Sequence, residues 1–68
     1  MSSIDKLFKG YGVEFFGEEP MRRVTDAQIE EARVFAFNEC ARLTEKYGPQ
    51  TKGTTRELFL NYLWGEYL

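Results

Sequence analysis

Residues 25–49 have the sequence TDAQIEEARVFAFNECARLTEKYGP, which contains a start signal, a long helical pattern and a stop signal. Thr25 and Gln28 have the Thr-x-x-Gln spacing of a capping box, in which each side chain bonds the other residue's backbone N–H. Gly48 suits the left-handed conformation that closes a helix, and Pro49 cannot continue one. The segment therefore predicts one long helix between these two signals.

A second helix is expected after a short polar connection, residues 48–53. Thr54 and Glu57 repeat the capping-box spacing, so the final helix is predicted to begin at Thr54 and to run to about Leu68. Two helices joined by so short a connection usually pack antiparallel. The C-terminal two thirds of the chain thus predict an antiparallel two-helix hairpin.

One face of the long helix carries small and apolar side chains at helical spacing. They are Ile29, Ala32, Ala36, Cys40, Leu43 and Tyr47. Because small residues let a second helix approach closely, this stripe is expected to meet Leu58, Phe59 and Leu63 of the final helix. Cys40 is expected to be a small, buried core residue within it.

The chain before Thr25 gives two weaker signals. Ile4, Leu7 and Phe8 have helical spacing, and they predict a short N-terminal helix that ends at Gly10.

The following segment, Tyr11 to Val24, combines partly alternating apolar side chains with turn-forming residues at positions 17–20. It is predicted to be either a short β-hairpin or an extended, irregular arm. The expected fold class is therefore mainly α, with a small α+β fold as the alternative, in a single small domain over residues 1–68.

The composition argues against several kinds of chemistry. The sequence has no histidine and one cysteine, Cys40, so the usual general base and metal ligand are missing and an intrachain disulfide is excluded. We therefore expect no enzyme activity, no catalytic residue, no cofactor and no metal site. A small secreted domain usually carries several disulfides, and no apolar run is long enough to span a bilayer, so a cytoplasmic protein is expected.

The charge pattern argues against nucleic acid as the partner. The formal net charge is −2, and no basic stripe is present to displace counterions from a phosphate backbone. Arg22 and Arg23 form the only adjacent basic pair, and Glu18, Glu19 and Asp26 flank it. A nucleic-acid-binding regulator that uses this pair is the weakest of three function classes.

Apolar side chains cover more of the final helix than one neighbouring helix can hide. The excess is concentrated where the chain ends, and Trp64, Tyr67 and Leu68 are therefore predicted to bind a partner. Trp and Tyr are frequent anchors of protein interfaces because they bury a large area and keep a polar tip. Phe35, expected on the polar face of the long helix, is predicted to mark a second, weaker contact.

These features predict a small acidic, non-enzymatic protein-interaction module. It would be an adaptor, or an inhibitor that occludes the surface of a larger partner protein. Viral proteins of the phage-antagonist type are an example by analogy of size and charge alone. The alternative is a homo-oligomeric structural or regulatory subunit, such as a homodimer, in which the final helix pairs with its own copy.

Overall fold

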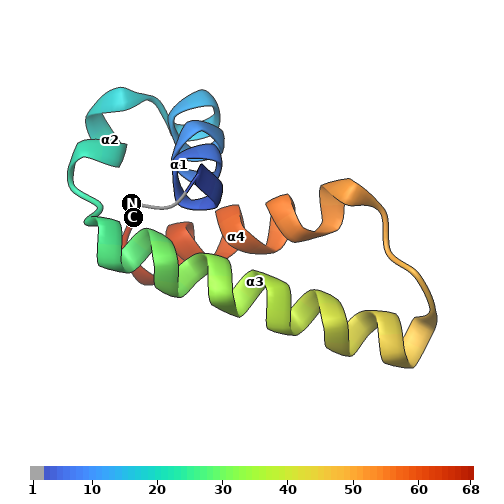
Figure 1. Ribbon diagram of the computed structural model, residues 1–68. Helices are drawn as coiled ribbons and strands as arrows, with labels where there is room; N and C mark the ends of the chain where they lie inside the picture. Colours follow the sequence, from blue (N-terminus) through green and yellow to red (C-terminus); the bar gives the residue numbers. More distant parts are fainter. Residues whose placement is uncertain (1–2) are drawn as a thin grey trace.

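The computed structural model describes residues 3–68, and within that range it contains four helices and no strand. The helices are α1 (Ser3–Phe16), α2 (Glu18–Arg22), α3 (Asp26–Tyr47) and α4 (Lys52–Glu66). Figure 1 shows α3 and α4 as an antiparallel hairpin, with α1 lying across one end of it and α2 beside α1. The predicted helical hairpin is therefore confirmed.

The ends of α3 agree with the sequence signals. The backbone N–H of Gln28 donates to Thr25 Oγ1 at 3.2 Å, and the Thr25 N–H donates to Gln28 Oε1 at 2.9 Å, which completes the capping box. At the other end Gly48 has φ 92°, a conformation that favours glycine, and its N–H donates to the Thr44 carbonyl. Local chemistry fixes both ends of this helix.

The start of α4 differs from the prediction. The helix begins at Lys52, and the backbone N–H of Thr54 already donates to the Thr51 carbonyl at 3.1 Å. Thr54 therefore lies inside the first turn and cannot act as the N-cap, so the predicted capping box with Glu57 is wrong. The N-cap position is held by Thr51, whose hydroxyl lies 3.2 Å from that of Thr54.

The predicted β-hairpin or extended arm between Tyr11 and Val24 is also wrong. α1 does not end at Gly10 but continues to Phe16, and the one-turn helix α2 follows directly. The chain turns between the two helices at Gly17, where φ is 97° and a side chain would be strained. In this helical arrangement Met21 packs between α2 and α1, and Phe16 of α1 reaches Trp64 of α4.

A second glycine in this segment allows α2 to pack closely on α1. A Cβ placed on Gly12 would lie 2.6 Å from Sδ of Met21 and would also overlap its Cε. Met21, which is 1 % exposed, enters the core of the molecule across this glycine. Gly12 therefore acts as a packing site within the helix, although glycine usually disfavours helix interiors.

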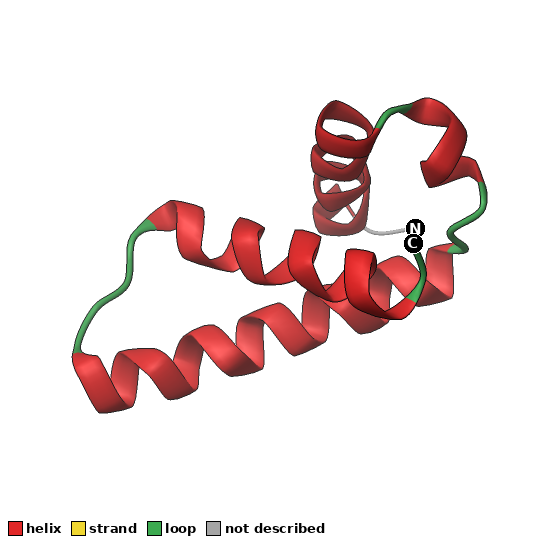
Figure 2. Ribbon diagram, turned by 180° about the vertical axis from the view of Figure 1, so that it is seen from behind, coloured by secondary structure: helices red, strands yellow, loops and turns green. Residues whose placement is uncertain are grey.

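The core lies where α1 and α2 cover one end of the α3–α4 hairpin. Its members come from all four helices and from the turn before α3: Phe8, Met21, Val24, Ile29, Ala32, Ala36, Phe59, Leu60 and Leu63. The predicted stripe of α3 is thus buried over its first half. Toward the connecting loop, α3 and α4 lie farther apart in both views (Figures 1 and 2). There Cys40 and Leu43 are only half-buried, and Tyr47 is 67 % exposed.

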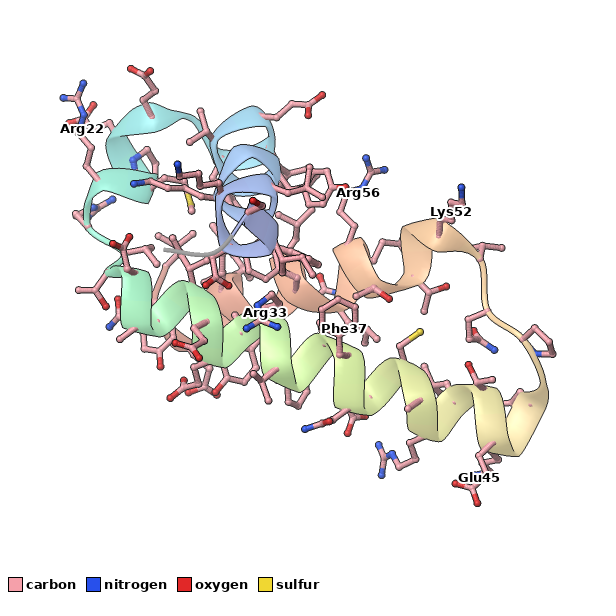
Figure 3. The ribbon with its side chains drawn as sticks, viewed as in Figure 1. Arg22, Arg33, Phe37, Glu45, Lys52 and Arg56 are labelled. Atoms are coloured by element: carbon pink, nitrogen blue, oxygen red, sulfur yellow. The ribbon has the colours of Figure 1, made fainter. Side chains whose placement is uncertain are left out.

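Two contacts hold α1 across the hairpin. The Phe8 ring meets the Phe59 ring edge-on, with centroids 4.8 Å apart, and the Phe37 ring at 5.7 Å. Beside them, Nε of Arg33 donates to Oδ1 of the buried Asp5 at 2.6 Å. Figure 3 shows Arg33 and Phe37 pointing from α3 toward α1. These contacts fix the position of α1, and with it the surface that α1 forms beside α4.

Candidate protein interface

Three aromatic rings from α1 and α4 form one exposed cluster. Trp64 is 65 % exposed and stacks on Phe16 of α1, with ring centroids 6.0 Å apart and planes 9° apart. Phe15 is 70 % exposed, and its ring meets that of Phe16 edge-on at 5.0 Å. Large aromatic side chains are therefore left at the surface although they contact one another.

These rings line an open groove of about 590 Å³, which we call the aromatic groove. Its lining residues are Phe15, Phe16, Glu57, Leu60, Asn61 and Trp64. Four of the six are apolar, and the polar groups are one carboxylate and one carboxamide. An apolar centre with a few polar groups beside it is the usual anatomy of a protein interface.

A second, smaller depression lies on the other side of α4, toward α3. We call it the side depression; its volume is about 270 Å³, and it is lined by Phe35, Leu58, Asn61, Tyr62, Gly65 and Glu66. The ring of Phe35, which is 38 % exposed, lies 4.6 Å from the ring of Tyr62. Phe35 is thus not isolated on a polar face, because α4 supplies an aromatic neighbour. Asn61 belongs to the lining of both depressions.

The remaining predicted site residues, Tyr67 and Leu68, are half-buried against the core. The hydroxyls of Tyr67 and Tyr62 both donate to Oε2 of Glu31 on α3, the second at 2.8 Å. Tyr67 therefore turns toward α3 and does not join Trp64 in the aromatic groove. The structure separates these two predicted anchors and pairs Trp64 with Phe16 instead.

The shared carboxylate changes the acidity of all three groups. The hydrogen bonds from Tyr67 and then from Tyr62 lower the pKa of Glu31, since they stabilise its charged form. The same interactions raise the pKa of Tyr62, and they raise the pKa of Tyr67 to about 12. This cluster attaches the C-terminal end of the chain to α3.

Phe15 and Phe16 belong to the surface but were missed as site residues. The sequence prediction placed them in a strand or arm, so nothing indicated that they would meet the final helix. They follow Phe8 by seven and eight residues, about two helical turns. This spacing is the signal that would have extended α1 and brought them to Trp64.

The arginine pair lies on a different part of the molecule. Arg22 belongs to α2 and makes an exposed ion pair with Glu18, with Nη2 and Oε2 3.6 Å apart. Figure 3 shows its side chain pointing away from the hairpin. The β-hairpin that was expected to present Arg22 and Arg23 to a nucleic acid is replaced by this short helix.

Residues 3–68 lack two further features, a cluster of metal ligands and a membrane-spanning helix. No group of three or more metal-ligating side chains is found there. None of the helices in this range has the length and apolar character needed to cross a membrane.

Comparison with known proteins gives no relationship on which a function could be based. No family model matches the chain, and neither a curated protein nor a solved structure matches it significantly. The exposed aromatic surface of α1 and α4 is thus the feature from which a function can be argued.

Proposed function

We propose that this chain is a non-enzymatic protein-binding module, an adaptor or an inhibitor, which holds a larger partner protein through the aromatic groove. The observation that carries the proposal is the exposure of Trp64 and Phe15 side by side with Phe16. In a chain of 68 residues the core needs its aromatic side chains, and it already uses Phe8 and Phe59 in this way. The exposure of the Phe15 and Trp64 rings is therefore better explained if a partner protein covers them.

The geometry of the groove supports this proposal energetically. Trp64 and Phe15 are held by their contacts with Phe16, so little side-chain freedom is lost when a partner covers them. Trp is among the residues most enriched at interface hot spots, where truncation commonly weakens binding by about 2 kcal/mol or more. Glu57 and Asn61 at the edge supply hydrogen-bonding groups.

Site-specific photo-crosslinking tests the proposal. A benzophenone amino acid at position 15, expressed in cells of the source organism, is expected to give a discrete adduct with one partner protein. The matched control carries the same group at Tyr47, which is 67 % exposed but lies near the distant end of α3. Adding Trp64→Ala to the position-15 variant should remove the adduct.

Two results would contradict the proposal. One is the absence of an adduct from position 15 in cells that express the folded protein. The other is the same set of adducts from positions 15 and 47, because this would show contact without selectivity for the groove.

A further inference from the structure

The outer surface of α4 forms a strip between two aromatic walls. Glu57, Asn61 and Gly65 follow one another at four-residue spacing and therefore share one face of the helix. Glu57 lines the aromatic groove, and Gly65 lines the side depression. Asn61, between them, lines both. At 1.5 Å per residue the strip is about 12 Å long, or roughly two helical turns.

Gly65 makes this strip accessible to another backbone. It is exposed, and a Cβ placed on it would meet no atom within 4 Å. No packing contact inside the molecule therefore requires a glycine at this position in the last turn of α4. Its missing side chain allows a partner helix to approach α4 closely between Trp64 and Tyr62, which lie on opposite sides of the strip.

The charge of the two depressions is purely negative. Glu57 and Glu66 are the charged residues in their linings. Among the described residues 3–68, neither carboxylate makes an ion pair. The C-terminal end of the α4 dipole adds to the negative potential. The nearest arginine along the chain, Arg56, lines a neighbouring hollow together with Glu57, and its guanidinium lies 5.8 Å from the Tyr11 ring instead of forming an ion pair with that carboxylate.

We infer that the partner element that docks on this strip is a basic amphipathic helix. The inference rests on the proposed function and specifies the chemistry of the partner. Apolar residues on one stripe of such a helix would enter the aromatic groove and the side depression. Lysine or arginine residues toward the two ends of such a helix would lie near Glu57 and Glu66, which stand at opposite ends of the strip.

The same charges disfavour a second copy of this chain as the occupant. A symmetric dimer through α4 would place the strip of one copy against the strip of the other. Glu57 and Glu66 of both copies would then gather in one interface without a basic residue among the lining residues. Like charges in such an arrangement oppose association.

A displayed library of 16-residue helical peptides, randomised at every position, provides the probe. Selection against the full chain, with depletion against Trp64→Ala, is expected to enrich peptides with apolar residues at i, i+3, i+4 and i+7 and with lysine or arginine toward the ends. The best peptide is then synthesised and its affinity is measured at low salt. Glu57→Lys should weaken its binding by at least about tenfold.

One control variant and one further test variant complete the experiment. Glu45→Lys makes the same charge change on an exposed residue of α3 that points away from the hairpin, and it should leave the affinity unchanged (Figure 3). Gly65→Gln lies in the last turn of α4, where glutamine is at least as good a helix former as glycine. It should therefore keep or slightly raise the melting temperature and yet weaken the binding of the peptide. Weaker binding by a protein of unchanged or higher stability cannot arise from a damaged fold.

Three outcomes would overturn the inference. Peptides that require Trp64 but carry no excess of basic residues, or no helical spacing, would leave the proposed function standing and refute the basic helix. Failure to recover any peptide that depends on Trp64 would refute the docking site on α4. Sedimentation showing a dimer that Trp64→Ala dissociates would identify a second copy as the occupant.

Discussion

Gly12 determines how closely α2 can approach α1. The side chain of Met21 fills the space that a Cβ at this position would need, and this methionine is 1 % exposed. Interiors packed at crystal-like density have little room for an additional methyl group. A single absent side chain therefore allows a helix of only five residues, too short to be stable alone, to dock on the core.

Gly12→Ala is expected to destabilise the protein by up to about 2 kcal/mol, because overpacking against the buried Met21 costs about 1–3 kcal/mol and the gain in helix propensity offsets part of that cost. Gly10→Ala is the matched control in the same helix, where a Cβ meets nothing within 4 Å. It should stabilise the protein by about 0.5–1 kcal/mol through helix propensity. Urea unfolding measures both free energies, and equal effects of the two variants would contradict the packing role of Gly12.

The cluster of Glu31 with Tyr62 and Tyr67 predicts a pH dependence with a defined sign. Folding lowers the pKa of Glu31 from its ordinary value of 4.5, so its stabilising effect is present above that pH and is lost as the pH falls through the lowered pKa. Folding raises the pKa of Tyr67 from 10.0 to about 12, so its effect is present below pH 10 and is lost as the pH rises toward 12.

Urea midpoints measured from acid to alkaline pH, for the wild type and for Glu31→Gln, test this dependence. The wild type should be the more stable protein at neutral pH, and the difference should shrink on both the acid and the alkaline side. A difference that does not vary with pH would show that the carboxylate does not accept these hydrogen bonds.

At the scale of whole helices, local signals determined what could be predicted. The boundaries of α3 follow from Thr25, Gln28 and Gly48, whose effects act within one turn. The path of α1 depends on a contact with α2 instead, because the packing of Met21 against Gly12 offsets the low helix propensity of this glycine. Considered alone, Gly10 indicates the end of a helix. The β-hairpin or extended arm was predicted from the partly alternating apolar residues that follow Gly10 and from the turn-forming residues at positions 17–20.

The separation of α3 and α4 toward the loop predicts an uneven stability along the hairpin. Leu63, which is fully buried, should lose about 2–5 kcal/mol on replacement by alanine. Leu43→Ala should cause a clearly smaller loss, because Leu43 is only half-buried. Chemical denaturation of the two variants provides the comparison. Equal losses would mean that the hairpin is packed along its full length.

Over the whole molecule, aromatic residues divide into a core set and a surface set. The sequence indicated that α4 has more apolar surface than one neighbour can cover, and the exposure of Trp64 agrees with that expectation. It could not indicate which rings lie beside Trp64, because Phe15 and Phe16 reach it only through the docking of α1. Nor could it place Tyr67, whose hydroxyl finds a carboxylate thirty-six residues away in the chain.

The fluorescence of Trp64, the only tryptophan in the chain, tests the proposed surface most directly. In the free protein its emission should be red-shifted and readily quenched by iodide, because the side chain is 65 % exposed. In the complex with the partner captured through position 15, measured with a partner whose own tryptophans are replaced, the emission should shift to shorter wavelength and resist iodide. An emission that is already blue-shifted and protected in the free monomer, or one that the partner leaves unchanged, would contradict the account.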